Sequence, residues 1–362
     1  MGRYGLERQF DNELVTDDLS LTINRNIQLR AEEILKDVAE GFGAVGGTVI
    51  VQNPKTGAIL ALGNYPAFDP NEYSKFPVSA YLNPAVELRY EPGSVFKVIT
   101  MAAGIDAGKI TPQTKYYDRG SVTIADRTIR NWDLEKHGAY GWATMTEVLE
   151  NSINTGAVFA ERTTGHDVFY NYLLRFGFGE LTEITLPGEL ISNLRNLKNS
   201  FRDINFATAS FGQGLAVTPI RLIASMSAIA NEGVLMKPFL LKNVEPAVVR
   251  QVISKETADQ VTKMMVSAVE KGRVAAIPNY TVAGKTGTAF TPDGRGGYST
   301  DVINTYVGFA PASDPAFTIL FKLDKPRGAP VAALTVVPAF RELAQFILNY
   351  YNIGPDNLNN KQ

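Results

Sequence analysis

The chain has 362 residues, 45% of them hydrophobic and 20% charged, which is enough for one large globular domain or two small ones. Its 35 basic and 37 acidic residues give a formal net charge of −2, and no basic run indicates a nucleic-acid partner. Cysteine is absent, which excludes disulfides and cysteine nucleophiles. The only two histidines, His137 and His166, are too few for a histidine-rich zinc site, and we expect both on the surface.

The N-terminal part of the chain contains an irregular segment, a strand, a helix and a hairpin. Residues 1–18 are polar and irregular and are predicted to be the remnant of a linker, and 19–24 is predicted to be a strand. Apolar residues recur on one face of a predicted helix at 25–41. Two β-branched runs at 46–64 then predict a hairpin.

The middle of the chain is mainly helical. A loop-rich stretch is followed by a helix from Ser94 to about Gly108, which is apolar nearly all round and should be buried. Short strands and turns are predicted at 110–140. Helices then dominate from 144 to about 275, and one of them, at 218–231, is apolar enough to be internal.

Strands return at the C-terminal end of the chain, before a last amphipathic helix. The predicted strands occupy 281–290, 303–311 and 316–324, and the helix occupies 338–351. Because strands lie at both ends with helices between them, the simplest packing is one sheet built from the two ends, with the helical block inserted.

The domain organisation follows from this packing. We predict one mixed α/β domain over 19–362, with a sheet subdomain from 19–64 and 276–362 and a mainly helical subdomain from 65–275. No segment reaches the roughly 18 apolar residues of a membrane span, and nothing at the N-terminus is typical of a signal peptide. We therefore expect the chain to be a trimmed part of a longer protein.

A serine and a lysine stand three residues apart at the start of the buried helix, in Ser94-Val95-Phe96-Lys97. Residues i and i+3 of a helix face the same way, so the hydroxyl and the amine can meet. Serine is a weak nucleophile until a base takes its proton, and lysine is a base only if it is held neutral, against an ordinary pKa of about 10.4. Burial and a second cation both lower a lysine pKa. Ser94 is thus a candidate nucleophile and Lys97 its base, although Ser94 alone would more simply be a helix N-cap.

Two further short motifs accompany this pair. Lys55-Thr56-Gly57 lies between two strand-like runs and predicts a hairpin turn, so we interpret Lys55 as structural. Lys285-Thr286-Gly287 lies within a predicted strand, where glycine often marks the close approach of a ligand or another backbone, and Lys285 is the candidate second cation. Ser152-Ile153-Asn154 is the only Ser-x-Asn in the chain, and it is a weak signal alone because both residue types are common in turns.

The order Ser-x-x-Lys, Ser-x-Asn, Lys-Thr-Gly is the signature of penicillin-binding proteins and class A β-lactamases. Over roughly residues 3–354 the chain resembles the transpeptidase domain of a class B (monofunctional) penicillin-binding protein. Two positions depart from the family pattern: Arg221 stands where glutamine is usual, and the loop after Phe290 is short. The supporting runs include Asn53-Pro54-Lys55-Thr56-Gly57, Tyr90-Glu91-Pro92-Gly93-Ser94, Leu186-Pro187-Gly188-Glu189 and Gly212-Gln213-Gly214.

The resemblance implies the penicillin-binding-protein/β-lactamase-like fold, a mostly antiparallel sheet flanked by helices with a large helical subdomain inserted. It implies a D-alanyl-D-alanine transpeptidase that needs no cofactor and cross-links peptidoglycan stem peptides outside the cytoplasmic membrane. β-Lactam antibiotics would be covalent inhibitors, and other cell-wall synthesis proteins would be partners. It also implies an N-terminal membrane anchor and a pedestal domain, neither of which is in this chain.

The same resemblance, together with the chemistry of the side chains, assigns the catalytic roles. Ser94 attacks the carbonyl of the penultimate D-alanine with neutral Lys97 as base, and Lys285 is the second cation. Ser152 relays a proton to the leaving amine, and Asn154 holds Lys97 and the substrate amide in place.

Substrate binding is assigned to the strand motif and its neighbour. Thr286, Gly287 and Thr288 bind substrate, and the two hydroxyls together with Lys285 suit its terminal carboxylate. The resemblance implies that the backbone N–H groups of Ser94 and Thr288 form the oxyanion hole, which is usually a large electrostatic contribution to acyl transfer.

Three rival functions share parts of this machinery. A serine β-lactamase needs a deacylating base, typically in a Glu-x-x-Leu-Asn motif that this chain lacks; Glu189 follows Ser152 by 37 residues but lies in Glu189-Leu190-Ile191-Ser192-Asn193. A β-lactam sensor or binding scaffold would generally lack the Ser-x-Asn motif. A D,D-carboxypeptidase, which uses water as acceptor, stays open because the choice of acceptor depends on the shape of the cleft.

Overall fold

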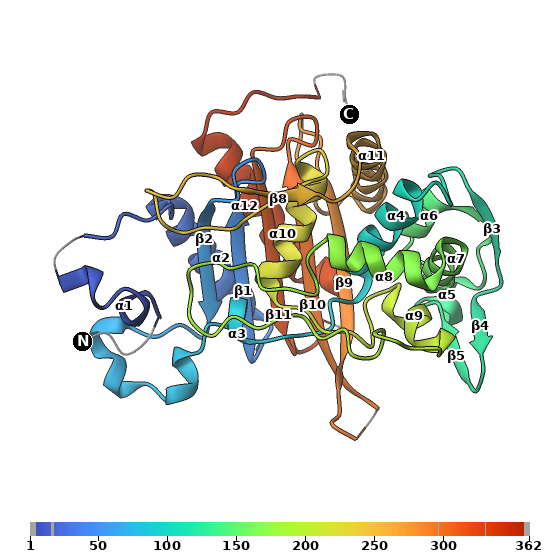
Figure 1. The fold of residues 1–362 in the computed structure, drawn as a ribbon, viewed down its shortest axis with the longest axis horizontal. Coiled ribbons are helices and arrows are strands. Elements are labelled where there is room, and N and C mark those ends of the chain that lie inside the picture. Colours follow the sequence, from blue (N-terminus) through green and yellow to red (C-terminus); the bar gives the residue numbers. More distant parts are fainter. Residues whose placement is uncertain (1–4, 16–17, 296, 330, 358–362) are drawn as a thin grey trace.

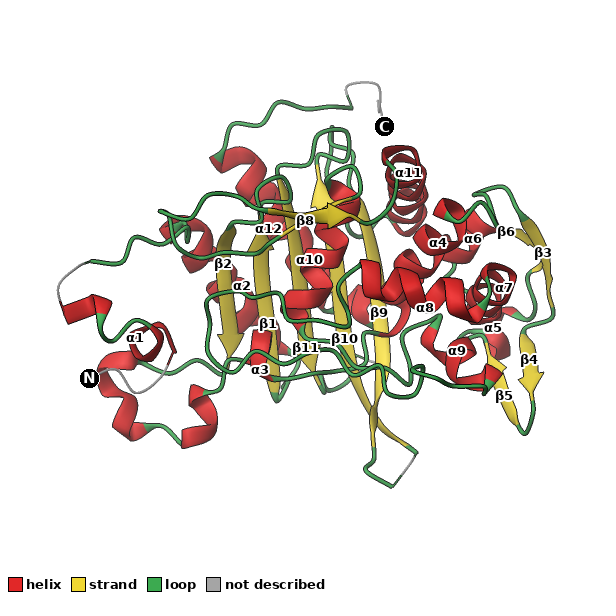
Figure 2. Cartoon of the chain, viewed as in Figure 1, coloured by secondary structure: helices red, strands yellow, loops and turns green. Residues whose placement is uncertain are grey.

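The computed structural model describes residues 5–15, 18–295, 297–329 and 331–357. Its centre is a five-stranded sheet in the order β2-β1-β11-β10-β9, with every neighbouring pair antiparallel. Strand β1 pairs with β11, so the two ends of the chain form one sheet as predicted (Figure 2). The five strands are β1 (Gly46–Gln52), β2 (Ile59–Tyr65), β9 (Ala283–Pro292), β10 (Tyr298–Ala310) and β11 (Phe317–Asp324).

Helices cover both faces of this sheet (Figure 1). Helices α2 (Arg25–Gly41) and α12 (Val336–Tyr350) pack on one face, and α10 (Pro219–Ala230) packs on the other. Side chains alternate along a strand, so in β1 Val49 faces the α2–α12 side and Ile50 faces the α10 side. Every residue of α10 is buried, which confirms the predicted internal helix.

A helical lobe with small two-stranded sheets lies beyond the β9 edge (Figure 1). The remaining helices are α1 (Gly5–Gln9), α3 (Pro84–Glu87), α4 (Lys97–Asp106), α5 (Leu134–His137), α6 (Met145–Glu150), α7 (Asn154–Thr164), α8 (His166–Arg175), α9 (Asp203–Ala209) and α11 (Lys255–Gly272). Short 3₁₀ helices are η1 (Glu13–Val15), η2 (Pro70–Lys75), η3 (Val78–Tyr81), η4 (Gly93–Phe96) and η5 (Ala332–Leu334). The small sheets of this lobe pair β3 (Lys115–Asp118) with β6 (Gly141–Thr144) and β4 (Ser121–Ile124) with β5 (Arg127–Arg130). A third pair, β7 (Val234–Met236) with β8 (Val248–Gln251), lies beside α10 instead (Figure 1).

The strand predicted at 19–24 is wrong, because this segment forms only an isolated bridge. The Thr22 N–H donates to Leu240 O at 2.7 Å, whereas the Asn24 N–H donates to Leu60 O at 2.8 Å. Successive donors therefore bond to two different segments, and no ladder can form along either of them.

Two other stretches differ from the sequence expectations. The predicted linker, 1–18, contains the short helices α1 and η1, and its residues 1–4 and 16–17 lie outside the described residues. The predicted helical block contains the β7–β8 pair, whose strands are too short to show a period-two pattern. The proposed boundaries of the two subdomains stay a prediction.

The two histidines differ in their surroundings. His137 is exposed and stacks on Tyr140, as expected of a surface residue. His166 is only partly exposed, and its ring nitrogens contact Glu161 at 2.7 Å and Asp203 at 3.2 Å. His166 thus reaches the surface only in part, and it gives the buried Glu161 carboxylate a hydrogen-bonding partner.

The packing of α12 on the sheet gives a stability prediction. Phe340 is fully buried and packs on Tyr306 with ring centroids 4.6 Å apart, so Phe340→Ala should lower the free energy of unfolding by about 3–5 kcal/mol. The same change at Phe201, which is 98% exposed, should alter it by no more than about 0.5 kcal/mol. Urea unfolding followed by circular dichroism measures both, and equal losses would contradict this account of the core.

Candidate active site

Two glycines hold the Ser94 turn against strand β9. Ser94 lies in η4, and the preceding Gly93 has φ of 58°, a left-handed value that favours glycine. A Cβ on Gly93 would lie 2.8 Å from Thr288 O, and one on Gly287 would lie 2.6 Å from Pro92 O. The glycine inside the strand therefore does mark the close approach of another backbone, and this approach sets Ser94 beside the edge of the sheet.

Lys97 is fully buried at the start of α4, and its amine contacts the turn between α6 and α7. Lys97 Nζ donates to Ser152 O at 2.5 Å, to Asn154 Oδ1 at 2.8 Å and to Ser152 Oγ at 3.2 Å. No hydrogen bond joins Lys97 Nζ to Ser94 Oγ in the part of the chain that the structure describes. The direct hydrogen bond expected from helical spacing is absent because the Lys97 amine donates to the Ser-x-Asn motif instead.

The Ser-x-Asn turn has a strained backbone. Ser152 has φ of 56°, which is uncommon for a residue other than glycine and tends to occur at functional sites. Asn154 is the first residue of α7, and its Nδ2 donates to Arg130 O at 2.8 Å. This bond fixes the amide so that Oδ1 faces Lys97.

Lys285 approaches the same serine from strand β9. Its Nζ donates to Ser152 Oγ at 3.1 Å, to Thr286 O at 3.1 Å and to Thr286 Oγ1 at 3.2 Å. The Ser152 hydroxyl thus lies between two lysine amines, both within 3.2 Å of it. The structure therefore brings together one group from each of the three motifs.

Burial decides the charge of this pair of amines. The pKa of Lys97 lies well below its usual range, first because the amine is buried and second because Lys285 is close, while the charge of Asp133 acts in the opposite direction. Burial lowers the pKa of Lys285 to about 7. Near neutral pH the two amines therefore do not both carry a full charge, which leaves a neutral amine available as a base.

The two threonines of the strand motif are placed differently. The Thr286 hydroxyl contacts Lys285, whereas the Thr288 hydroxyl accepts from Ala332 N at 3.3 Å and lies 3.4 Å from Asn304 Oδ1. The Thr288 carbonyl faces the Gly93 turn, and the N–H of a strand residue points to the same side as its C=O. The Thr288 N–H therefore faces the Ser94 turn, while its hydroxyl is already bonded elsewhere.

Two residues that the motifs did not reveal connect the loops around the site. Glu91 accepts from Gly214 N at 3.0 Å and from the Tyr298 hydroxyl at 3.0 Å, and burial raises the pKa of Glu91. These bonds tie the β9–β10 hairpin to the segment just before Ser94. The Gly212-Gln213-Gly214 run was part of the family resemblance, and its Gly214 N–H donates to Glu91. No local pattern, however, can relate Glu91 to a tyrosine 207 residues away.

A serine beside two buried lysines, at the seam between an antiparallel sheet and a helical lobe, defines the class of serine acyl-transfer sites shared by penicillin-binding proteins and serine β-lactamases. Residues 47–343 match the family model of the penicillin binding protein transpeptidase domain. The chain belongs to this family. Within the described ranges, no helix is long and apolar enough to cross a membrane, and no group of three or more acidic or histidine side chains is placed to hold a metal ion.

Similar proteins extend beyond this chain. It is 35% identical over 328 residues to stage V sporulation protein D of Bacillus subtilis, covering 86% of this chain and 50% of that protein. It is 30% identical over 378 residues to the peptidoglycan D,D-transpeptidase FtsI homolog of Mesostigma viride, covering 93% of this chain and 62% of that protein. The chain therefore spans about half to three-fifths of the length of these relatives.

A solved structure gives the same fold. Penicillin binding protein 3 of Mycobacterium tuberculosis, complexed with ampicillin, superposes with a TM-score of 0.87 at 29% sequence identity, covering 95% of this chain and 80% of that one. The sequence and structure comparisons therefore confirm both the predicted family and the predicted fold class.

The buried amine of Lys285 should make folding stability depend on pH. Because its folded pKa of about 7 lies below its ordinary value of 10.5, the unfolded chain binds more protons between these pH values, and stability rises with pH in that window. Lys285→Met removes this contribution. Relative to the variant, the wild type should gain at most about 3 kcal/mol of unfolding free energy between about pH 7 and pH 9.5.

The other Lys-Thr-Gly copy supplies a matched control. Lys55 is exposed and pairs with Asp314 on the surface, so Lys55→Met should show no comparable pH-dependent difference. Denaturant titrations at the two pH values measure all three proteins. If the unfolding free energy rose equally with pH in the wild type and in Lys285→Met, Lys285 would keep its ordinary pKa in the folded protein.

Proposed function

We propose that this chain is the catalytic domain of a peptidoglycan D,D-transpeptidase, which forms an acyl-enzyme at Ser94 and cross-links stem peptides. One observation carries the proposal: the Ser152 hydroxyl lies between two buried lysine amines. That arrangement provides a base with a lowered pKa, a proton relay and a positive charge in one pocket. These are the parts that acyl transfer from an amide requires.

Acylation begins when Ser94 Oγ attacks the carbonyl carbon of the penultimate D-alanine and its proton passes to neutral Lys97. Apo geometry often tightens only when substrate binds, so the absence of a direct bond between these two side chains is compatible with this step. The N–H groups of Ser94 and Thr288 stabilise the negative charge that develops on the carbonyl oxygen. The C–N bond then breaks, and the leaving amine receives its proton through Ser152.

The acyl-enzyme is resolved by an amine of a second stem peptide. This amine attacks the ester carbonyl of the acylated Ser94, its proton passes back along the Ser152–Lys97 route, and the Ser94 hydroxyl is restored. A new amide joins the two peptides, so the atoms balance without a cofactor.

The carboxylate of the terminal D-alanine needs a positive partner at the other end of the scissile residue. Lys285 and the Thr286 hydroxyl, which lie 3.2 Å apart, supply a cation and a donor at the edge of β9. The Thr288 hydroxyl is already bonded to its own neighbours, so we assign Thr288 a backbone role only.

Glu189 is unsuited to be the deacylating base of a β-lactamase. Its two carboxylate oxygens accept from Thr182 N at 2.6 Å and from Glu183 N at 3.0 Å. A carboxylate held by backbone N–H groups stabilises a loop and is not free to activate water. This favours a slowly hydrolysed β-lactam adduct over rapid turnover.

The setting of the domain follows from the same proposal. Peptidoglycan lies outside the cytoplasmic membrane, so we place the domain on the extracytoplasmic face, anchored by an N-terminal segment outside this chain. Other cell-wall synthesis proteins are the expected partners, and β-lactams are the expected inhibitors. The Mycobacterium tuberculosis neighbour solved with ampicillin supports the last point.

Labelling with a fluorescent penicillin tests the nucleophile. The wild type should give a covalent adduct that persists for minutes or longer, and Ser94→Ala should give none, because the Ser94 hydroxyl is the group that carries the acyl chain. Ser79→Ala, at an exposed serine of η3, should label like the wild type. Covalent labelling of Ser94→Ala would show that another residue is the nucleophile. Rapid loss of the wild-type adduct would indicate a β-lactamase.

The pH dependence of labelling tests the base. Removing the charge of Lys285 raises the pKa of Lys97, so Lys285→Gln should shift the acidic limb of the acylation rate to higher pH. The maximal rate should fall by about 10²-fold or more, because a stabilising positive charge is lost. Lys55→Gln should leave the profile unchanged. If the acidic limb of the Lys285→Gln profile lay at the same pH as that of the wild type, Lys285 would not be the charge that lowers the pKa of Lys97.

A further inference from the structure

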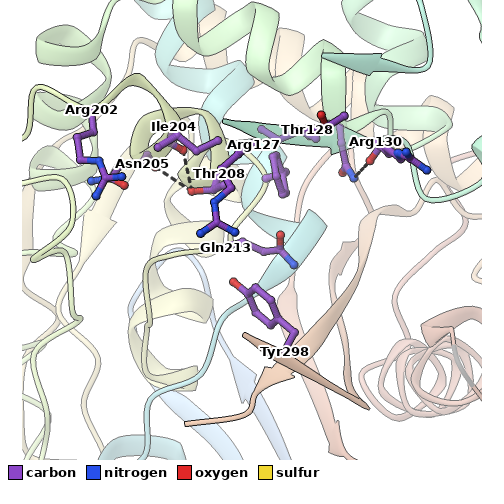
Figure 3. Close-up of a pocket in the computed structure, with 12 residues that line it drawn as sticks. Arg127, Thr128, Arg130, Arg202, Ile204, Asn205, Thr208, Gln213 and Tyr298 are labelled. Atoms are coloured by element: carbon purple, nitrogen blue, oxygen red, sulfur yellow. Dashed lines mark hydrogen bonds between the residues drawn. The ribbon is translucent and has the colours of Figure 1, made fainter. Parts of the chain in front are cut away.

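A cavity of about 450 Å³ adjoins the candidate active site on the side of the helical lobe. Its walls come from strand β5, helix α9 and the start of strand β10, and Figure 3 shows it from within. Of the residues that line it, the catalytic assignments above use only Asn154. Its position beside the site raises the question of what part of a substrate it would accept.

The cavity is positively charged. Arg127, Arg130 and Arg202 line it, as does Gln213, and none of its lining residues is acidic. The side chain of Arg127 points into the cavity toward Gln213 (Figure 3). Its nearest carboxylate is the exposed Asp126 at 3.9 Å, and Arg202 makes no ion pair with any described residue. Guanidinium groups with little compensation favour an anion, because each can donate two parallel hydrogen bonds to a carboxylate.

One residue joins the cavity to the site. Asn154 lines the cavity, its Oδ1 accepts from Lys97 at 2.8 Å, and its Nδ2 donates to the backbone of Arg130, another lining residue. A ligand in the cavity would therefore lie one side chain away from the amine that serves as base. At the opposite wall stands Tyr298, which pairs with Pro292 at the far end of β9.

The order of groups along β9 gives the direction of the bound peptide. The terminal carboxylate is assigned to Lys285 and Thr286, and the scissile carbonyl to Thr288, so the peptide runs antiparallel to the strand. Its upstream residues then lie toward Pro292 and the cavity. Four residues of strand from Thr288 to Pro292 span roughly 13 Å, which places the cavity two to four peptide residues upstream of the acylated one.

We infer that this cavity binds a side-chain carboxylate of the donor stem peptide, upstream of the residue that acylates Ser94. The inference rests on the proposed function and names the chemical class of donor that the site selects: a peptide that is anionic two to four residues before its scissile bond. Arg127 and Arg202 are then specificity-determining residues, and they play no part in the chemical steps.

Two matched penicillins test the inference. Both carry a dipeptide on the 6-amino group, acetyl-Glu-Gly in one and acetyl-Gln-Gly in the other, so they differ only in one charge at the upstream end. The second-order rate constant of Ser94 acylation is measured for each by competition with a fluorescent penicillin. The proteins are wild type, the double variant Arg127→Gln/Arg202→Gln, and Arg341→Gln, which alters an exposed arginine on α12.

The wild type and Arg341→Gln should both react about 10-fold faster with the glutamate penicillin, as expected for a charge-assisted hydrogen bond. The preference should weaken in high salt and should vanish in the double variant, while the rate with the glutamine penicillin stays unchanged. No preference in the wild type, or a preference that survives in the double variant, overturns the inference. Equal losses for both penicillins in the double variant also overturn it, because they indicate a structural role. Failure of the wild type to be labelled by any penicillin overturns the proposed function itself.

Discussion

The candidate active site depends on two lysine amines that share one serine hydroxyl in a buried seam. Ser152 Oγ lies 3.2 Å from Lys97 and 3.1 Å from Lys285, and both amines are almost fully removed from water. Two ammonium groups this close and this buried would repel one another strongly, so at least one amine gives up its proton near neutral pH. The same repulsion that lowers the pKa of Lys97 suits this amine to act as a base, and it also makes the site a local cost to folding stability.

The fold makes this cost tolerable by placing the seam between two well-packed units. The sheet is buried on both faces by α2 and α12 on one side and by α10 on the other, and α4 carries Lys97 into a largely apolar cluster. Strand β9 is the edge of the sheet, so it has one side free to face the Ser94 turn. Glycines at 93 and 287 let the two backbones approach, and this approach sets the Thr288 backbone against the Ser94 turn.

An edge strand beside the Ser94 turn also explains how a peptide substrate could be recognised at several positions along its length. A peptide added to β9 would meet a carboxylate site at Lys285, the nucleophile at Ser94 and the arginine-lined cavity in sequence. Backbone hydrogen bonds would supply affinity without selecting side chains. Selection would then come from the charges at the two ends of the strand, and so donor preference can vary among relatives while the chemistry is unchanged.

The sequence by itself determined the elements and groups whose signals are local. Helical and strand periodicity located α2, α10 and the β1–β2 hairpin, and the strand context separated Lys285 of β9 from the turn residue Lys55. Burial of Lys97 also followed from the apolar helix around it.

Tertiary structure alone decided the contacts between residues far apart in the chain. It placed Lys97 against Ser152 and left Ser94 without the direct bond that helical spacing suggested. It also paired Glu91 with Tyr298 and brought Arg127 and Arg202 into one cavity. The segment 19–24 failed to become a strand for the same physical reason: a strand requires a partner along its whole length, and the position of that partner is set by the packing of the entire molecule.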